Sequence, residues 1–192
     1  MLLADMKNQD SNHDFGKDII PTMLNDGRKL YAYKFKGYWK DVGTIDSLWE
    51  ANMDLLDPNV PLDLHDSRWR IYSRSPVMPP HYASPESVIQ NSLISEGCNI
   101  EGHIDFSVLF AGVTIEPGAV VRDSIIMPNT TIKKGAVVEY AIVGEDCVIG
   151  ENVKVGARPE SIEDKDTWGV AVIGHGVTVS DNAEIKPKAM IS

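Results

Sequence analysis

The sequence predicts a mixed α/β segment followed by an all-β, single-stranded parallel β-helix built of six-residue repeats. Two observations carry this prediction. Aliphatic residues recur at every sixth position through the second half of the 192-residue chain, and this period fits neither an α-helix nor a simple hairpin meander. The segment at 1–57 instead alternates between short helical and strand patterns. We therefore expect short strands that pair with the coils above and below, with aliphatic side chains stacked inside.

The six-residue ladder is clearest from Val113 to Ile191. Of its 14 positions 11 are apolar, whereas the composition predicts about 6. An upstream set from Val88 to Phe106 keeps the same step one residue out of phase, which predicts a single insertion between Phe106 and Val113. Small side chains four positions beyond the ladder predict a second inward row: Cys98, Ala141, Cys147, Val153, Val177, Ala183 and Ala189.

Two features break the regularity of the coil. Glycine follows the ladder residue at several corners, where we expect it to supply a positive φ: Gly144, Gly150, Gly156 and Gly174. Residues 158–169 are polar, charged and aperiodic, so they are predicted to leave the coil as a loop with Trp168 folded back on it. Such loops are where these scaffolds place function.

The front segment begins with a predicted helix and a predicted strand. The helix covers Asp14 to Leu24, with Asp14 as its N-cap and Gly27 beyond its end. Alternation of aromatic with other residues from Tyr31 to Phe35 predicts the strand.

A second helix is predicted from Ile45 to Leu56, capped by Thr44, with its apolar side chains on one face. So short a segment cannot cover a sheet edge and two apolar helix faces, and we expect residues 1–57 to belong to a larger domain. Residues 58–87 are rich in proline and predict an extended connector, with one possible strand at Trp69 to Tyr72.

Charge and composition exclude several function classes. The formal net charge of −10 argues against nucleic acid or an anionic membrane as the main partner, because both require a basic face. The sequence contains no apolar stretch that could span a bilayer and no signal-peptide pattern at Met1, so we expect a cytoplasmic protein. The two cysteines lack metal-ligand spacing and are expected to be reduced.

Two strings in the front segment are more specific than the periodicity. They are His-Asp-Phe-Gly-Lys-Asp-Ile-Ile-Pro at 13–21 and Gly-Tyr-Trp-Lys-Asp-Val-Gly-Thr at 37–44. Followed by hexapeptide coils, they resemble the bacterial glucose-1-phosphate adenylyltransferases across the whole chain. Other sugar-1-phosphate nucleotidyltransferases share this order of parts, so the sugar and the base depend mainly on the first string.

The resemblance implies a fold and a set of boundaries. Residues 1–57 would be the C-terminal α/β remnant of a nucleotidyltransferase domain, and 58–87 would be its connector. Residues 88–192 would form a left-handed parallel β-helix, with three hexapeptides in each coil and a loop insertion at 158–169.

The resemblance also implies a reaction, in which ATP and glucose 1-phosphate give ADP-glucose and diphosphate for glycogen synthesis. Mg²⁺ would be the cofactor, because a hard cation bound by carboxylate oxygen neutralises the triphosphate. Asp41 matches the metal-binding aspartate of the family, although a turn aspartate alone is more often a backbone hydrogen-bonding residue. Trp39, Lys17 and Asp14 would lie near the substrate.

The sequence departs from the family in two places. It contains neither a Gly-rich triphosphate loop after a predicted strand nor the Glu-Lys pair that holds the sugar phosphate. It therefore looks like the C-terminal half of the enzyme and is expected to be inactive alone. Bacterial members are homo-oligomers, typically tetramers, controlled by phosphorylated metabolites. Arg158 and Lys165 are candidates for such an anion site, and Lys133 and Lys134 are more simply solvent-facing.

Two alternatives remain open. The chain could be a non-catalytic regulatory or assembly subunit of the same enzyme. It could also be a hexapeptide-repeat acyltransferase, with His103 or His175 as the catalytic base. The acyltransferase hypothesis leaves the segment at 1–57 unexplained. The five histidines show no spacing typical of metal ligands.

Overall fold

The computed structural model describes residues 1–64, 66–70, 72 and 76–192. Its chain divides into two compact units, Met1–Gly37 and Tyr38–Ser192. The first unit contains α1 (Leu2–Asp5), the π-helix η1 (Phe15–Ile19) and α2 (Ile20–Asn25). Asp14 Oδ1 accepts a hydrogen bond from the backbone N–H of Lys17 at 2.7 Å, which caps η1. The predicted first helix and its N-cap are thus confirmed.

The strand predicted at Tyr31 to Phe35 is wrong. These residues form no strand, and the side chains of Tyr31 and Tyr33 are 88% and 89% exposed. Alternation of this kind is a β pattern, but a strand is stable only when it pairs with a neighbouring edge. The described strands all belong to the β-helix, and none of them pairs with residues 31–35.

The second unit opens with the predicted second helix, here α3 (Ile45–Met53) continued by the 3₁₀ turn η2 (Asp54–Leu56). Thr44 Oγ1 accepts from the backbone N–H of Ser47 at 3.2 Å. The Ser47 hydroxyl in turn accepts from the backbone N–H of Thr44 at 3.0 Å. This reciprocal capping box satisfies two N–H groups that a helix leaves unpaired at its start.

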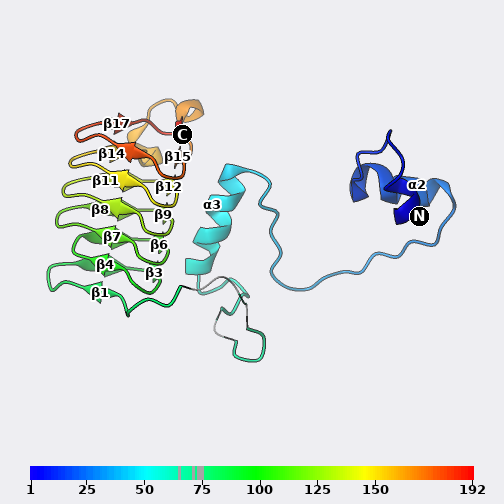
Figure 1. The fold of residues 1–192 in the computed structure, drawn as a ribbon, viewed down its shortest axis with the longest axis horizontal. Helices are drawn as coiled ribbons and strands as arrows, with labels where there is room; N and C mark the ends of the chain where they lie inside the picture. The colour runs from blue at the N-terminus through cyan, green and yellow to red at the C-terminus, as the bar shows by residue number, and fades with distance from the viewer. Residues whose placement is uncertain (65, 71, 73–75) are drawn as a thin grey trace. The chain divides into compact units, whose positions relative to one another are not determined.

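Residues 82–191 form a parallel β-helix with three faces, and the described residues give each face six strands (Figure 1). Sheet A contains β1 (Tyr82–Ala83), β4 (Asn99–Ile100), β7 (Thr114–Ile115), β10 (Thr131–Ile132), β13 (Val148–Ile149) and β16 (Thr178–Val179). Sheet B contains β2 (Val88–Gln90), β5 (His103–Asp105), β8 (Val120–Arg122), β11 (Val137–Glu139), β14 (Lys154–Val155) and β17 (Glu184–Ile185). Sheet C contains β3 (Leu93–Ile94), β6 (Val108–Leu109), β9 (Ile125–Ile126), β12 (Ala141–Val143), β15 (Ala171–Ile173) and β18 (Met190–Ile191).

The predicted β-helix is therefore confirmed, and it begins with β1 before the expected Val88. The possible strand at Trp69 to Tyr72 includes residue 71 and so lies partly outside the described residues. None of the helices formed by the described residues has the length and apolar character that a bilayer crossing requires.

The inward side chains stack as predicted in the later coils. Val143, Ile149, Val155 and Ile173 are at most 1% exposed and belong to one continuous core. The second row of small residues also lines this core, from Cys98 through Cys147 and Val153 to the partly buried Val177 and Ala183.

The single insertion predicted between Phe106 and Val113 is wrong, because the change of phase is distributed over several coils. Val121 pairs with Val138 and Val138 with Val155, so each of these coils falls one position short of three full hexapeptides. The missing position is at the corner between sheets B and C. Phe106, Asp123 and Tyr140 occupy this corner in successive coils with φ of 43°, 49° and 48°. A single residue in the left-handed region turns the chain from sheet B to sheet C, which makes this corner one residue shorter than the other two.

The glycines that follow the ladder have a different role from the predicted one. Of the four, only Gly156 has a positive φ, at 68°. At Gly144 a Cβ atom would lie 2.8 Å from the backbone carbon of Gly174 and 2.9 Å from the carbonyl oxygen of Ile173. Glycine is required at Gly144 because neighbouring coils approach too closely for a side chain, which is a packing requirement and not one of dihedral angle.

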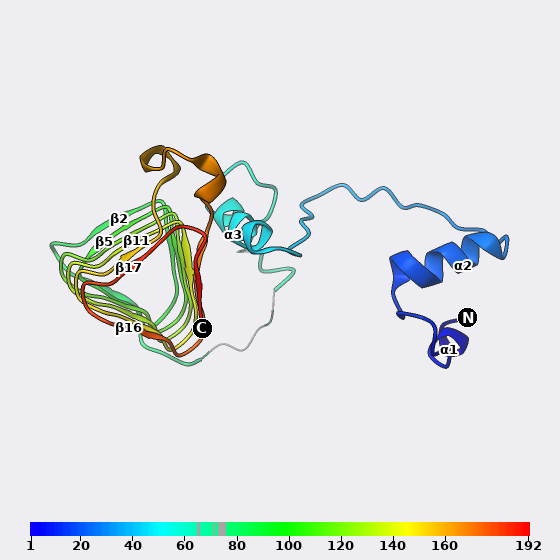
Figure 2. The same cartoon turned by 90° about the horizontal axis from the view of Figure 1, so that it is seen from above.

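Helix α3 covers the outer face of sheet C (Figures 1 and 2). Outward-facing apolar side chains of this sheet, Val108, Ile125 and Ile142, form one buried cluster with Met53 and Leu56 of the helical segment and with Val170, which precedes β15. Thus α3 belongs to the same compact unit as the β-helix, although its residues fall within the segment 1–57.

The predicted loop is confirmed and replaces one corner between sheets B and C. Residues 156–170 stand where earlier coils use a single left-handed residue, and they contain the 3₁₀ turns η3 (Pro159–Ser161) and η4 (Lys165–Thr167). Trp168 folds back as expected: its indole N–H donates to the carbonyl of Ala157 at 2.8 Å. Its ring meets that of Tyr140 edge-on at 5.2 Å.

Candidate functional site

The segment before α3 is anchored to the end of that helix by one carboxylate. The hydroxyl of Tyr38 and the ammonium of Lys40 both donate to Asp54 Oδ2, each at 2.9 Å. Lys40 also lies 3.2 Å from a carboxylate oxygen of Glu50. The second string of the sequence is therefore fixed at two alternate positions.

The intervening residues of this string face outward. Trp39 is 76% exposed and Asp41 is also exposed. Burial alternates along the segment: Tyr38 and Lys40, which donate to Asp54, are half-buried, whereas Trp39 and Asp41 are exposed. Asp41 thus presents a carboxylate to solvent shortly before the helix cap.

The charges of the anchor support one another. The hydrogen bond from Lys40 is the main cause that lowers the pKa of Asp54, and the hydrogen bond from Tyr38 lowers it further. The same carboxylate raises the pKa of Lys40. The pKa of Tyr38 is raised first by desolvation and then by its hydrogen bond to Asp54. At neutral pH the anchor is therefore an ion pair with a neutral phenol.

The first string lies in the first unit. Asp14 uses its carboxylate to cap η1, and Lys17 is exposed. Asp18 Oδ2 accepts from the backbone N–H groups of Asn12 at 3.1 Å and Asp14 at 3.2 Å. The carboxyl groups of this string therefore organise its own backbone.

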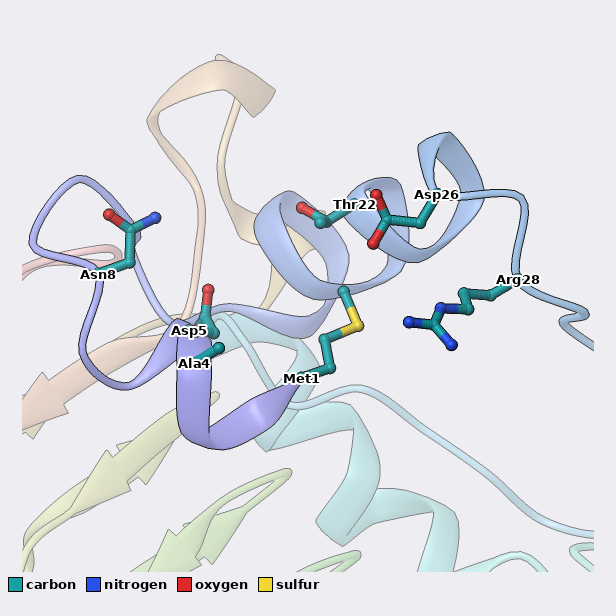
Figure 3. Close-up of a pocket in the computed structure, with 7 residues that line it drawn as sticks. All are labelled: Met1, Ala4, Asp5, Asn8, Thr22, Asp26 and Arg28. Carbon is teal, nitrogen blue, oxygen red and sulfur yellow. The ribbon is translucent and has the colours of Figure 1, made fainter.

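A shallow hollow of about 340 Å³ lies in the same unit, with polar side chains around it (Figure 3). None of the site residues predicted from the sequence lines this hollow. At its rim, Asp5 accepts from the Ser11 hydroxyl at 2.7 Å and contacts His13 Nδ1 at 3.1 Å. These contacts, with that of Ser11 the larger, lower the pKa of Asp5. The hollow is lined by Met1, Ala4, Asp5, Asn8, Thr22, Asp26 and Arg28.

The structure places Arg158 and Lys165 in the same loop but with separate partners. The guanidinium of Arg158 lies 3.4 Å from Glu139 and 3.9 Å from Asp123. The ammonium of Lys165 donates to the loop carbonyls of Pro159 and Ile162. The anion site proposed for these two residues remains a prediction.

The candidate acyltransferase histidines lie apart on the β-helix. His103 lies in β5 and is partly buried, whereas His175 is exposed at a later corner with Nδ1 3.9 Å from Asp146. Glu145, Asp146 and His175 have possible ligand atoms within 4.8 Å of one another. Sequence spacing missed this cluster, because only coil stacking brings residue 175 beside 146.

Comparisons with known proteins agree with this architecture. A family model described as GlmU-like, C-terminal hexapeptide, matches residues 81–180. A second model, described as nucleotidyl transferase, matches residues 1–58. The two matches follow the order of parts inferred from the sequence.

Curated relatives named glucose-1-phosphate adenylyltransferase include those of Bacillus mycoides (strain KBAB4), Bacillus cereus (strain ATCC 14579) and Bacillus anthracis. Each is 52% identical over 175 residues, which is 91% of this chain and 45% of the relative. The chain thus spans a little under half the length of these relatives. The resemblance drawn from the two strings is confirmed, and the chain belongs to the GlmU-like C-terminal hexapeptide family, joined to a segment of the nucleotidyl transferase type.

Proposed function

We propose that this chain is part of a glucose-1-phosphate adenylyltransferase, the enzyme that converts ATP and glucose 1-phosphate into ADP-glucose and diphosphate. The observation that carries the proposal is the segment at residues 38–44, in which Tyr38 and Lys40 are anchored on Asp54 and Asp41 is exposed. The relatives of that name, 52% identical across 91% of the chain, support it.

Asp41 is the residue that would bind Mg²⁺. Its carboxylate is a hard oxygen donor and is exposed, which suits a cation that keeps several waters and takes only one or two carboxylates together with substrate phosphates. The bound cation would neutralise charge on the triphosphate. This chain would contribute one metal-binding side chain, Asp41. Trp39, Lys17 and Asp14 are proposed to lie near the substrate.

We further propose that the protein acts in the cytoplasm as a homo-oligomer, a tetramer in the bacterial pattern, with phosphorylated metabolites as effectors. These proposals rest on the family resemblance. Sedimentation of the purified chain would measure the oligomer.

The test compares the chain alone with a chimera in which it replaces the matched segment of the Bacillus cereus relative. We expect no ADP-glucose from the chain alone, because it contains neither the Gly-rich triphosphate loop nor the Glu-Lys pair. The chimera should form ADP-glucose from ATP, glucose 1-phosphate and Mg²⁺. In the chimera Asp41→Asn should lower kcat by roughly 100-fold or more, since a neutral amide is a poor Mg²⁺ ligand.

Asp57→Asn is the matched control, because Asp57 is exposed and lies beyond the end of η2. It should leave kcat unchanged. A chimera that folds but keeps full activity with Asn at residue 41 would contradict the proposed role of Asp41. A folded but inactive chimera would favour the alternative of a non-catalytic assembly subunit.

A further inference from the structure

We propose that Asp54 is a positioning residue for adenylyl transfer, acting through Tyr38 and Lys40 to hold Asp41 in its metal-binding orientation. This inference rests on the proposed function. It assigns a task to a carboxylate that lies outside both strings and would itself touch neither metal nor substrate.

The first argument is that two donors converge on one oxygen atom. Tyr38 and Lys40 each donate to Asp54 Oδ2 at 2.9 Å, across 16 and 14 residues of chain. The side chains of Asp54 and Lys40 are only 30% and 24% exposed. Glu50, one helical turn earlier, is 55% exposed and makes a longer contact with Lys40 at 3.2 Å. Asp54 is thus the main anchor and Glu50 a secondary one.

The second argument concerns which part of the chain the anchor holds. Helix α3 is attached to the β-helix independently: Met53 and Leu56 are buried against sheet C, and the indole N–H of Trp49 donates to the carbonyl of Asp123 at 2.7 Å. Docking of α3 therefore does not need Asp54. The bonds to Asp54 fix only the segment that carries Trp39 and Asp41.

The third argument concerns how far Asp41 would be displaced if the segment were not anchored. Residues 39 and 41 alternate with the two anchored residues, so release of Lys40 frees Asp41 at the adjoining peptide. A ligand misplaced by about 1 Å can cost roughly 100-fold in rate, because the reacting groups are no longer held in line. An anchor on the neighbouring residue is thus a direct control on the orientation of Asp41.

The experiment uses Asp54→Asn and Asp54→Ala, each in the isolated chain and in the chimera. In the isolated chain, the ¹⁵N backbone order parameters of residues 38–41 should fall in both variants, because the segment moves more freely. The order parameters of residues 45–56 should stay unchanged. In the chimera, kcat should fall about 10-fold and the KM for Mg²⁺ should rise, with Tm lowered by no more than about 2–4 °C.

Three further variants sharpen the result. Lys40→Met should reproduce the lower order parameters at residues 38–41, since it removes the charged donor to Asp54. Glu50→Gln should have a smaller effect, and the control Asp57→Asn none. Tyr38→Phe should have an effect between those of Lys40→Met and Glu50→Gln, because it removes the uncharged donor and leaves the charged one.

The outcomes separate this inference from the proposed function. Full activity of Asp41→Asn would overturn the proposed function. If Asp41→Asn is inactive while the Asp54 variants keep wild-type order parameters at residues 38–41, kcat and KM for Mg²⁺, only the positioning role is overturned. Lower order parameters across residues 45–56, or a Tm lowered by more than about 4 °C in both Asp54 variants, would show that Asp54 supports general stability and would also overturn the positioning role.

Discussion

Among single residues, Asp123 combines a strained backbone with an unfavourable charge. Its φ is 49° and its side chain is 18% exposed. Desolvation raises the pKa of this carboxyl, and the nearby Arg158 only partly offsets the effect. The folded state binds the proton more tightly than the unfolded state does, so protonation of Asp123 stabilises the fold. This stabilisation is fully present below the unfolded pKa and is lost as the pH rises through the folded pKa. Ionised Asp123 therefore destabilises the fold at neutral pH.

We predict that Asp123→Asn raises Tm at pH 7 by about 2–4 °C, the change that roughly 1 kcal/mol produces in a chain of this size. The amide removes the buried charge, and asparagine also tolerates positive φ. The gain should shrink at pH 3.5, where the aspartate is largely protonated in both states. Thermal unfolding followed by circular dichroism at the two pH values measures both effects.

Asp146→Asn is the control, because Asp146 also has a positive φ, of 55°, but its side chain is 51% exposed. It should change Tm less than Asp123→Asn does. Equal gains at both positions, or a gain at Asp123 that does not depend on pH, would assign the effect to backbone conformation instead of charge.

Between elements, three aromatic side chains join α3, a corner of the β-helix and the loop. Trp49 of α3 stacks on Tyr140 at 5.4 Å, and Tyr140 meets Trp168 of the loop at 5.2 Å. Burial also raises the pKa of the Tyr140 phenol, so the ring stays neutral at physiological pH. The middle residue of this stack is one of the left-handed corner residues, so the short corner itself presents the ring to both neighbours.

We predict that Trp49→Ala lowers the free energy of unfolding by about 3 kcal/mol, since it removes a large packed side chain together with the hydrogen bond to the Asp123 carbonyl. Urea denaturation of the full chain measures this change. Trp69→Ala is the matched control, because Trp69 is 83% exposed, and it should have no measurable effect. An equal loss in the two variants would contradict the docking role of α3.

Across the β-helix as a whole, stability depends on stacking of successive coils around one inner row. Each coil contacts only its neighbours, as in other solenoids, so a defect in a central coil weakens both adjacent interfaces. Ile149 lies in β13, which pairs with strands on both sides, and its side chain is fully buried.

We predict that Ile149→Ala lowers the free energy of unfolding by about 2–5 kcal/mol and Ile149→Val by about 0.5–1.5 kcal/mol, because the cavity grows with the volume removed. Chemical denaturation of both variants gives the two values. Val77→Ala, at a fully exposed position, should leave stability unchanged. A loss for Ile149→Ala no larger than that for Ile149→Val would show that the inner row does not hold the coil together.

Much of the fold could be predicted because its signals are local or periodic. The cap at Thr44, the cap at Asp14 and the inward row from Val143 onward all follow from nearby residues. The phase of the earlier coils could not be predicted, because shortening a corner by one residue does not change how many apolar residues the sequence contains.

The candidate site was predicted only in part. The string at residues 37–44 points to Asp41 as the proposed metal ligand, which stays a prediction. Asp54 carries no motif and became visible only through its contacts with Tyr38 and Lys40. The cluster of Glu145, Asp146 and His175 was likewise invisible, because coil stacking, and not spacing along the chain, brings its members together.

The linear order of residues was sufficient to establish the parallel β-helix, the loop at 158–169 and the family of the chain, since repeat period and motif strings are properties of that order. Spatial contacts were needed to establish that the segment at 31–35 forms no strand, that α3 packs on sheet C, and that Lys40 is paired with Asp54. These outcomes depend on which surfaces and charges meet in space. Pairing energy is available only where a partner edge, an apolar face or an opposite charge is brought within contact distance.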